Sequence, residues 1–276
     1  MEYLRGHSIK PKEITPIGTV IFTDGTNDVS ANQLTCEAYG YTYNASTGLC
    51  EAFRYNSNLN RAFSNTSNTF TGEGNVTESG TNNALLSGSQ NTTKGENTNV
   101  LITGKSNEIG NGLDNTSVIG GTYANALRQS EVIIGGGEAL GRNQSSTVQL
   151  AGTTENATAT SLTVQGDGSS YMAVQNNSIF AFEVKVIVLC SGGIDGTAGH
   201  YAYLELKGAV QVDDGYNLVF SQSSTTIASV GSTGTAELAG VTDPYITVEV
   251  TGAANRNLEW FASVKITEKK LSTDTF

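Results

Sequence analysis

Three short stretches of the chain share one pattern: NALLSGSQN (83–91), NVLITGKSN (99–107) and NTSVIGGTY (115–123). Each contains a short apolar run followed by a glycine, and each begins sixteen residues after the one before it. A fixed interval of this length is the sequence signature of a repeat architecture. The repeat, and not any single element, therefore decides the fold.

The repeat extends over six copies within residues 67–158 when the copies are aligned on the glycine. The residue two positions before each glycine is apolar, and alternate residues of a strand share one face. We expect a parallel β-roll or β-helix solenoid, with the glycines where the chain bends tightly or where backbones approach closely. The glycine column is Gly72, Gly88, Gly104, Gly120, Gly136 and Gly152, and the apolar column is Phe70, Leu86, Ile102, Val118, Ile134 and Leu150.

The opposite strand face is apolar in several copies as well. Strands with two apolar faces are covered on both sides, but a sixteen-residue coil is too thin to supply that cover. We expect identical chains to supply it as a homotrimer around an axis. The candidate trimer contacts are Leu85, Leu101, Ile119 and Ile133.

The sixteen-residue period stops near residue 160, and longer alternating strands follow. FAFEVKVIV (180–188) and LEWFASVKIT (258–267) each place apolar residues on one face. Regularly spaced strands with turn signals between them predict an antiparallel, jelly-roll-like β-sandwich over 159–276. With an N-terminal β module over 1–66, the fold class is all-β.

Two of the three cysteines lie in the N-terminal region. Cys36 and Cys50 bracket a segment with alternating tyrosines and a turn signal, NASTG (44–48). The ends of such a hairpin are close enough for a disulfide, and two unpaired buried thiols are the alternative. Cys190 follows an apolar strand and is expected to be a small buried hydrophobic residue.

The composition argues against several classes of partner. The net charge is −11, and nucleic acids and anionic membranes both attract clustered Lys and Arg instead. No run approaches the roughly 18 apolar residues of a membrane span, and the first ten residues lack the apolar core of a signal peptide. We therefore expect no nucleic-acid partner, no membrane partner and no export by the general route.

Candidate chemistry is weak throughout the chain. GGGEALG (135–141) lacks the Lys-Ser/Thr of a phosphate loop, and DGTND (24–28) matches no complete calcium loop. Glu73 and Glu78 could serve glycoside cleavage, but they fall on polar turns. We therefore assign no catalytic, cofactor or metal residue and expect that the chain is not an enzyme. Tyrosines of the C-terminal module could stack on sugars or pack the core: Tyr171, Tyr201, Tyr203, Tyr216 and Tyr245.

Three stretches carry a resemblance to bacteriophage fibre proteins. FEVKVIVLCSGG (182–193) followed by TGAANRNLEWFASVKITE (251–268) resembles a C-terminal β-sandwich of phage tail-fibre and other virion structural proteins. SVIGG (117–121) and EVIIGGG (131–137) look like the β-roll repeats of phage fibres and of trimeric autotransporter adhesin heads. The block from 19 to 56 is similar to N-terminal regions of such phage proteins.

The resemblance implies a structural fibre or spike of a phage virion. It implies a homotrimer that is assembled in the host cytoplasm and acts outside the cell. Its N-terminus would attach to a capsid or tail protein, as in a head or tail fibre, and its C-terminal domain would adhere to a host or surface glycan. A trimeric polysaccharide depolymerase on the same scaffold and a bacterial trimeric adhesin head are the alternatives.

Overall fold

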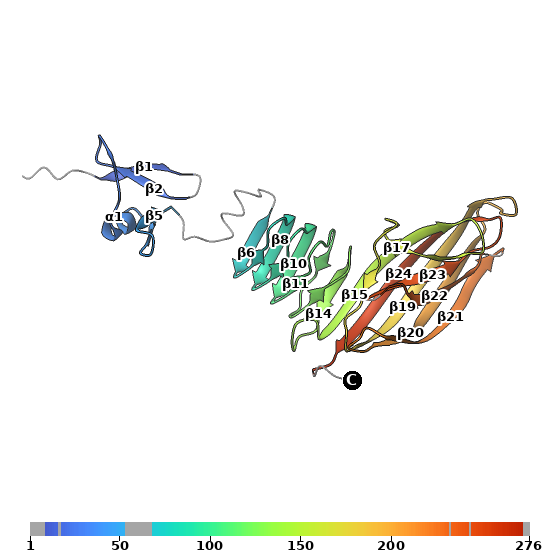
Figure 1. The fold of residues 1–276 in the computed structure, drawn as a ribbon. Coiled ribbons are helices and arrows are strands. Elements are labelled where there is room, and N and C mark those ends of the chain that lie inside the picture. Colours follow the sequence, from blue (N-terminus) through green and yellow to red (C-terminus); the bar gives the residue numbers. More distant parts are fainter. Residues whose placement is uncertain (1–8, 16–17, 53–67, 232, 243, 273–276) are drawn as a thin grey trace, which may run out of the picture. The chain divides into compact units, whose positions relative to one another are not determined.

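The computed structural model describes residues 9–15, 18–52, 68–231, 233–242 and 244–272 (Figure 1). The chain divides into two compact units, 1–66 and 67–276. The predicted all-β class is confirmed, because the described residues contain a single helix of six residues, α1 (Gln33–Ala38).

The N-terminal unit is built from two small antiparallel sheets and the helix. Phe22 is fully buried in its core and packs edge-on against Tyr39 and Tyr41. The first sheet contains β1 (Lys10–Ile14), β2 (Val20–Thr23) and β3 (Asp28–Val29), and the second contains β4 (Thr42–Asn44) and β5 (Leu49–Glu51).

A disulfide joins Cys36 to Cys50, with Cα atoms 5.7 Å apart. The hairpin predicted around NASTG is present as β4 and β5, and Tyr43 pairs with Cys50. Cys36, however, lies on α1 and not at the start of a strand. Asn32 begins the helix because its side chain accepts a hydrogen bond from the Thr35 N–H at 2.9 Å, which satisfies one of the free donors of the first turn.

The second unit begins with the predicted parallel solenoid. Residues sixteen apart pair directly, such as Leu85 with Leu101. One sheet of the solenoid stacks β6 (Thr69–Glu73), β8 (Asn82–Ser89), β10 (Thr98–Lys105), β12 (Ser117–Val118) and β14 (Val132–Gly135). The other stacks β7 (Val76–Thr77), β9 (Thr92–Thr93), β11 (Glu108–Ile109) and β13 (Asn125–Ala126).

Asparagines at the turns hold successive coils together. Asn91 is fully buried, and its side-chain amide donates to the carbonyl of Gly104 in the next coil at 2.9 Å. Its carbonyl oxygen accepts from the backbone N–H of Asn107 at 3.1 Å. Because each amide satisfies backbone groups of its own coil and of its neighbours, the ladder fixes the coil spacing.

The register changes within the fourth coil, after Val118, so the predicted columns are wrong from Gly120 onward. Val118 pairs with Ile133, fifteen residues on, and not with Ile134. Ile133 is 0% exposed and Ile134 is 53% exposed, the reverse of the prediction, so Ile133 cannot contact a second chain.

The cause of this shift in register is a corner made by two glycines at positive φ, Gly120 and Gly121, followed by a shorter turn before β14. The glycines whose backbones approach closely from coil to coil run from Gly104 to Gly121 and then to Gly135. The predicted members Gly120 and Gly136 are not part of this column.

The expected sixth coil is also wrong. Leu150 and Gly152 belong to β15 (Asn143–Thr154), which runs antiparallel to β14. Leu150 is buried, but in the core of the sandwich. The solenoid therefore has about four turns, and its sheet continues into the C-terminal module without a break (Figure 1).

Two antiparallel sheets share the C-terminal core. Trp260 lies in this core, and its Nε1 donates to Thr154 Oγ1 at 2.9 Å. One sheet joins β15 to β24 (Asn257–Lys270), β19 (Ser178–Gly192), β20 (Tyr201–Val212) and β21 (Leu218–Val230), with β17 (Thr163–Val164) beside β15. The other contains β16 (Ala159–Ser161), β18 (Met172–Ala173), β22 (Thr235–Gly240) and β23 (Tyr245–Thr251).

The corrected glycine column predicts unequal effects of two alanine substitutions. At Gly88 a Cβ atom would overlap the carbonyl oxygen of Gly104, whereas at Gly120 it would meet no atom within 4 Å. Both glycines have positive φ, so each substitution costs about 1–2 kcal/mol of stability from the backbone conformation. We expect Gly88→Ala to cost about 1–3 kcal/mol more through overpacking.

Equilibrium urea unfolding followed by far-UV circular dichroism measures this difference. Gly120→Ala is the control, because its φ is also positive (75°, against 107° at Gly88) but no atom lies within 4 Å of the added Cβ. Equal losses of stability in the two variants would contradict the assignment of Gly88, and not Gly120, to the column of closely approaching backbones.

Candidate functional site

A buried ion cluster lies at the junction of the solenoid and the sandwich. Arg128 comes from the turn before β14, Glu131 lies just before that strand, and Glu268 comes from β24. Arg128 Nη1 lies 2.7 Å from Glu131 Oε1, and its Nη2 lies 3.4 Å from Glu268 Oε2. Burial alone would lower the pKa of Arg128, but the two carboxylates outweigh it and raise that pKa above its ordinary value.

The same guanidinium also reaches the smaller sheet of the sandwich. Arg128 Nε donates to the carbonyl oxygen of Ala173 at 2.7 Å. One side chain of the solenoid therefore bonds both sheets of the sandwich, through Glu268 on β24 and Ala173 on β18. These contacts fix the last coil against the sandwich.

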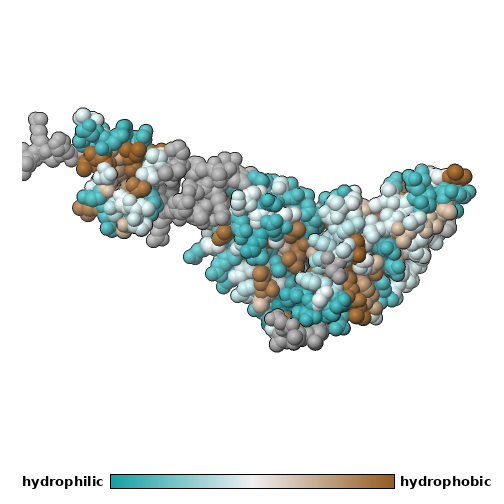
Figure 2. Space-filling view, viewed as in Figure 1, coloured by the Kyte–Doolittle hydropathy of each residue, from teal (hydrophilic) through white to brown (hydrophobic). Residues whose placement is uncertain are grey.

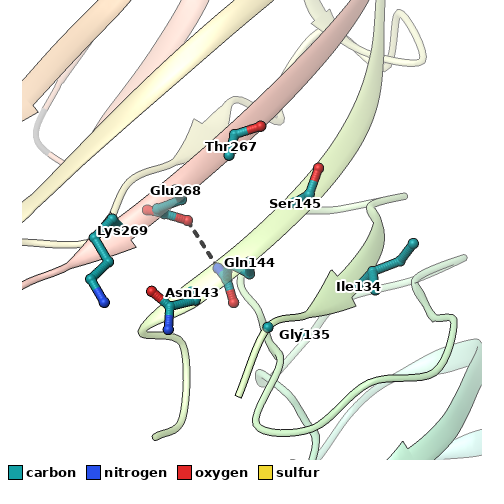
Figure 3. A pocket seen from close by; sticks show the side chains of 9 residues that line it. Ile134, Gly135, Asn143, Gln144, Ser145, Thr267, Glu268 and Lys269 are labelled. Carbon is teal, nitrogen blue, oxygen red and sulfur yellow. Dashed lines mark hydrogen bonds between the residues drawn. The ribbon is translucent and has the colours of Figure 1, made fainter. Parts of the chain in front are cut away.

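Three surface hollows lie around this junction and on the sandwich. The first, about 390 Å³, is drawn in Figure 3. Ile134, Ser145 and Thr267 pair across β14, β15 and β24 along it. Behind them, Gln144 Nε2 donates to Glu268 Oε2 at 2.9 Å, the bond dashed in Figure 3. We assign this hollow to the exposed apolar face described below, because Ile134 is part of that face.

The second hollow, about 420 Å³, lies between turns of the solenoid and strands of the sandwich. Tyr171, Ala173 and Tyr245 form its sandwich side. Its remaining lining residues are Asn111, Gly112, Leu113, Leu127, Gln129, Ser169 and Ser170. None of the ten lining residues carries a charge.

The third hollow, about 270 Å³, holds two carboxylates. Glu237 on β22 and Glu249 on β23 are direct cross-strand partners. The Gln222 side chain bonds both the N–H and the carbonyl of Leu238, each at 2.9 Å, and so fixes β21 against β22 beside them. Like charges directly opposite each other destabilise a sheet, so this pair has no structural benefit.

The residues proposed as trimer contacts mostly lie on the outward solenoid face. Leu85 and Ile119 are exposed, and Leu101 is half-buried between them. Ile133 is the exception, and Val132 and Ile134 lie outward in its place.

The structure does not bring Glu73 and Glu78 together as a catalytic pair. Glu73 is exposed on β6, and Glu78 forms an ion pair with Lys94 at 3.4 Å.

The possible calcium ligand Asp24 closes a turn. Its Oδ1 accepts hydrogen bonds from the N–H groups of Thr26 and Asn27, both at 2.8 Å. Across the described ranges, no group of three or more His, Cys, Asp and Glu side chains is placed to hold a metal ion. In the same part of the chain, no helix has the length and apolar character needed to cross a membrane.

Sequence reasoning missed the ion cluster, although one signal for it is present. The inward series on the last strand runs Leu258, Trp260, Ala262, Val264 and Ile266, and its next member is Glu268. A carboxylate on the core face of a strand requires a buried partner. The partner, Arg128, is 140 residues away, and no sequence pattern links the two.

Comparisons with known proteins give a distant likeness to phage tailspikes. No family model and no curated protein matches the chain. The tailspike protein of Acinetobacter baumannii phage AM24 is 9% identical over 75% of this chain and 51% of that chain, with a TM-score of 0.29. The tailspike protein of Acinetobacter baumannii bacteriophage Fri1, a capsular polysaccharide depolymerase, is 9% identical over 76% of this chain and 48% of that one, with a TM-score of 0.27. The chain thus spans about half the length of the tailspike chains that it matches.

These comparisons contradict one expectation from the sequence. The chain was expected not to be an enzyme, whereas one of the similar structures is described as a capsular polysaccharide depolymerase. We therefore withdraw that expectation.

The ion cluster predicts a large effect of a single substitution. Arg128→Met leaves two carboxylates buried without their partner, and we expect a loss of about 3–5 kcal/mol in unfolding free energy. Urea unfolding followed through the fluorescence of Trp260, the only tryptophan of the chain, measures this loss.

The control for this experiment is Lys269→Met. Lys269 pairs with Glu138 at 3.0 Å, but both side chains are more than half exposed, so little stability should be lost. If Arg128→Met were no more destabilising than this control, the cluster would not hold the two parts together.

Proposed function

We propose that the chain is a tail spike or fibre protein of a bacteriophage virion, working as a homotrimer that binds a polysaccharide on the host surface. In this proposal residues 1–66 attach the chain to a capsid or tail protein, residues 67–158 include the shaft, and residues 159–276 present the binding surface. The protein is assembled in the host cytoplasm and acts outside the cell as part of the virion.

The observation that carries the proposal is an apolar stripe on the outward face of the solenoid. Leu85, Leu101 and Val132 lie in one row of paired residues across four successive strands, and the half-buried Ser117 interrupts this row on β12. Ile119 and Ile134 follow two residues after Ser117 and Val132, on the same face. A contiguous exposed apolar surface of this kind marks an interaction site.

The stripe has a counterpart on the outward face of the sandwich. Phe261 on β24 pairs with Ile187 on β19, which pairs with Tyr203 on β20. Leu189 and Tyr201 form the neighbouring row. Brown patches appear over both the solenoid and the sandwich on the face seen in Figure 2. One continuous sheet therefore carries two apolar areas on its outward side, one on the solenoid and one on the sandwich, with the polar side chains of Ser145, Thr147 and Gln149 on β15 between them.

A closed ring of identical chains covers such a face on every subunit at once. Rotational symmetry gives each chain the same contact and ends the assembly at a fixed number of subunits. Three subunits also display three copies of the binding surface. Weak binding at each copy then yields strong attachment, because the second and third events are intramolecular.

The stripe predicts that single charges on it dissociate the trimer. We expect the wild-type chain to elute as a trimer and Ile119→Glu or Ile134→Glu to give folded monomers, because burying the new carboxylate in the interface is costly. Size-exclusion chromatography with light scattering measures the mass, and circular dichroism checks the fold.

Ile194→Glu is the matched control, since Ile194 is 90% exposed outside the stripe. A wild-type chain that is a stable monomer would rule out this assembly. The binding part of the proposal is tested separately, by sedimenting the wild-type protein with polysaccharide extracted from cells that the virion infects.

The pair Glu237 and Glu249 favours a second candidate function, a polysaccharide depolymerase. Directly opposed residues of an antiparallel pair have Cβ atoms about 4.5–5.5 Å apart. From that spacing two Glu side chains can bring their carboxyl groups to the separation of about 5–5.5 Å that retaining glycosidases use. Incubation with the extracted polysaccharide should then release reducing ends, and Glu237→Gln and Glu249→Gln should each abolish the release. Glu259→Gln, on a different sheet, is the control; undiminished cleavage in both active-pair variants would exclude this site.

A further inference from the structure

We propose that the hollow between Tyr171 and Tyr245 is a binding subsite for an uncharged sugar unit within a polysaccharide. This inference rests on the proposed polysaccharide binding and assigns it a place and a ligand class. The volume of about 420 Å³ is within the range of roughly 300–1,000 Å³ that is usual for small-molecule sites.

The two tyrosines project from one face of the smaller sheet. Ala173 pairs directly with Tyr245 across β18 and β23. Tyr171 lies two residues before Ala173, so its side chain is on the same face and diagonal to Tyr245. Ala173 adds only a methyl group to this wall of the hollow. Tyrosine side chains offer an apolar ring face to the C–H side of a pyranose and a hydroxyl to its polar edge.

The facing wall comes from the solenoid and is mixed in character. Leu113 and Leu127 both lie beside Gly110, where an added Cβ would be 3.3 Å and 3.9 Å from their side chains. They supply apolar contact, and Asn111 and Gln129 supply amides. Asn111, Gly112, Ser169 and Tyr245 are exposed. The hollow is thus open to solvent, as is needed for a sugar unit within a longer chain.

The two walls are held at a fixed separation. The carbonyl of Ala173, on one wall, accepts the hydrogen bond from Arg128 Nε at 2.7 Å. Arg128 lies between Leu127 and Gln129, which belong to the other wall. Because the guanidinium is buried and bound on three sides, the hollow is preorganised before a ligand arrives.

The charges around the hollow select against acidic sugars. None of its lining residues is charged. Arg128, the cation between the lining residues Leu127 and Gln129, is 1% exposed and engaged by Glu131 and Glu268. The Asp167 carboxylate accepts hydrogen bonds from the N–H groups of Ser169 and Ser170, both at 2.8 Å, which places a negative charge beside the rim. With a net charge of −11 on the chain, uronic and sialic acids are repelled and neutral hexoses or N-acetylhexosamines are accepted.

Titration calorimetry of the full chain against defined oligosaccharides tests the assignment. The neutral probes are maltohexaose, cellohexaose and chitohexaose, and the acidic probe is a hyaluronate hexamer. We expect at least one neutral probe to bind and the acidic probe to bind at least about tenfold more weakly. Tyr171→Ala and Tyr245→Ala should each weaken neutral binding by about fivefold or more.

Tyr123→Ala is the matched control, because Tyr123 is 38% exposed, close to the 41% of Tyr245, and lies outside both the hollow and the apolar stripe. Neutral binding that survives both tyrosine substitutions, a preference for the acidic probe, or no binding of any neutral probe would overturn the assignment. Sedimentation of the wild-type protein with the extracted host polysaccharide is scored separately, so this subsite can fail while the proposed function stands.

Discussion

The constraint on which the structure depends is the exact stacking of one coil on the next. In parallel coils every residue lies above its counterpart, so the backbone of one coil limits the side chain in the next. At Gly72 and Gly88 the carbonyl oxygen of the following coil occupies the space that a Cβ would need. The buried asparagines act in the same direction, because each one bonds backbone groups of adjacent coils. A change in one coil is therefore felt by both of its neighbours.

The stacking of coils ends after β14, where a buried ion cluster takes over the role of joining neighbouring parts of the chain. Past β14 the strands become antiparallel and the inner space passes to the sandwich core. At this point hydrophobic contact between coils stops, and a buried cation with two carboxylates joins the parts. Such clusters contribute less to stability than their short distances suggest, because the desolvation of the charges opposes their attraction. Here the arrangement decides which solenoid turns face which strands of the sandwich, and so it decides the shape of the hollow beside Tyr171.

The sequence predicted the parts of the structure that depend on local periodicity. The solenoid, its period and the inward residues as far as Val118 in the fourth coil followed from alternation and spacing. So did the long strands of the sandwich, including the inward series that ends at Ile266. The prediction failed at Ile134 because a one-residue shift reverses which face of a strand is buried. That shift comes from a longer glycine corner and a shorter turn, which do not interrupt the apolar pattern of EVIIGGG. The contact between Arg128 and Glu268, 140 residues apart, depends on tertiary packing. Its only signal in the sequence is a charged residue, Glu268, at a position of β24 that faces the core.

The short strand β12 gives the solenoid a defined point of mechanical failure. Seven residue pairs join β8 to β10, but only two join β10 to β12 and two join β12 to β14. The hydrogen bonds between coils run along the stacking direction, so a pull in that direction stretches all of them at once. Tension applied to the C-terminal module therefore loads β12, the strand with the fewest paired residues among the solenoid strands of this sheet. A molecule under load would part there first, with the three earlier coils still stacked and the sandwich still folded.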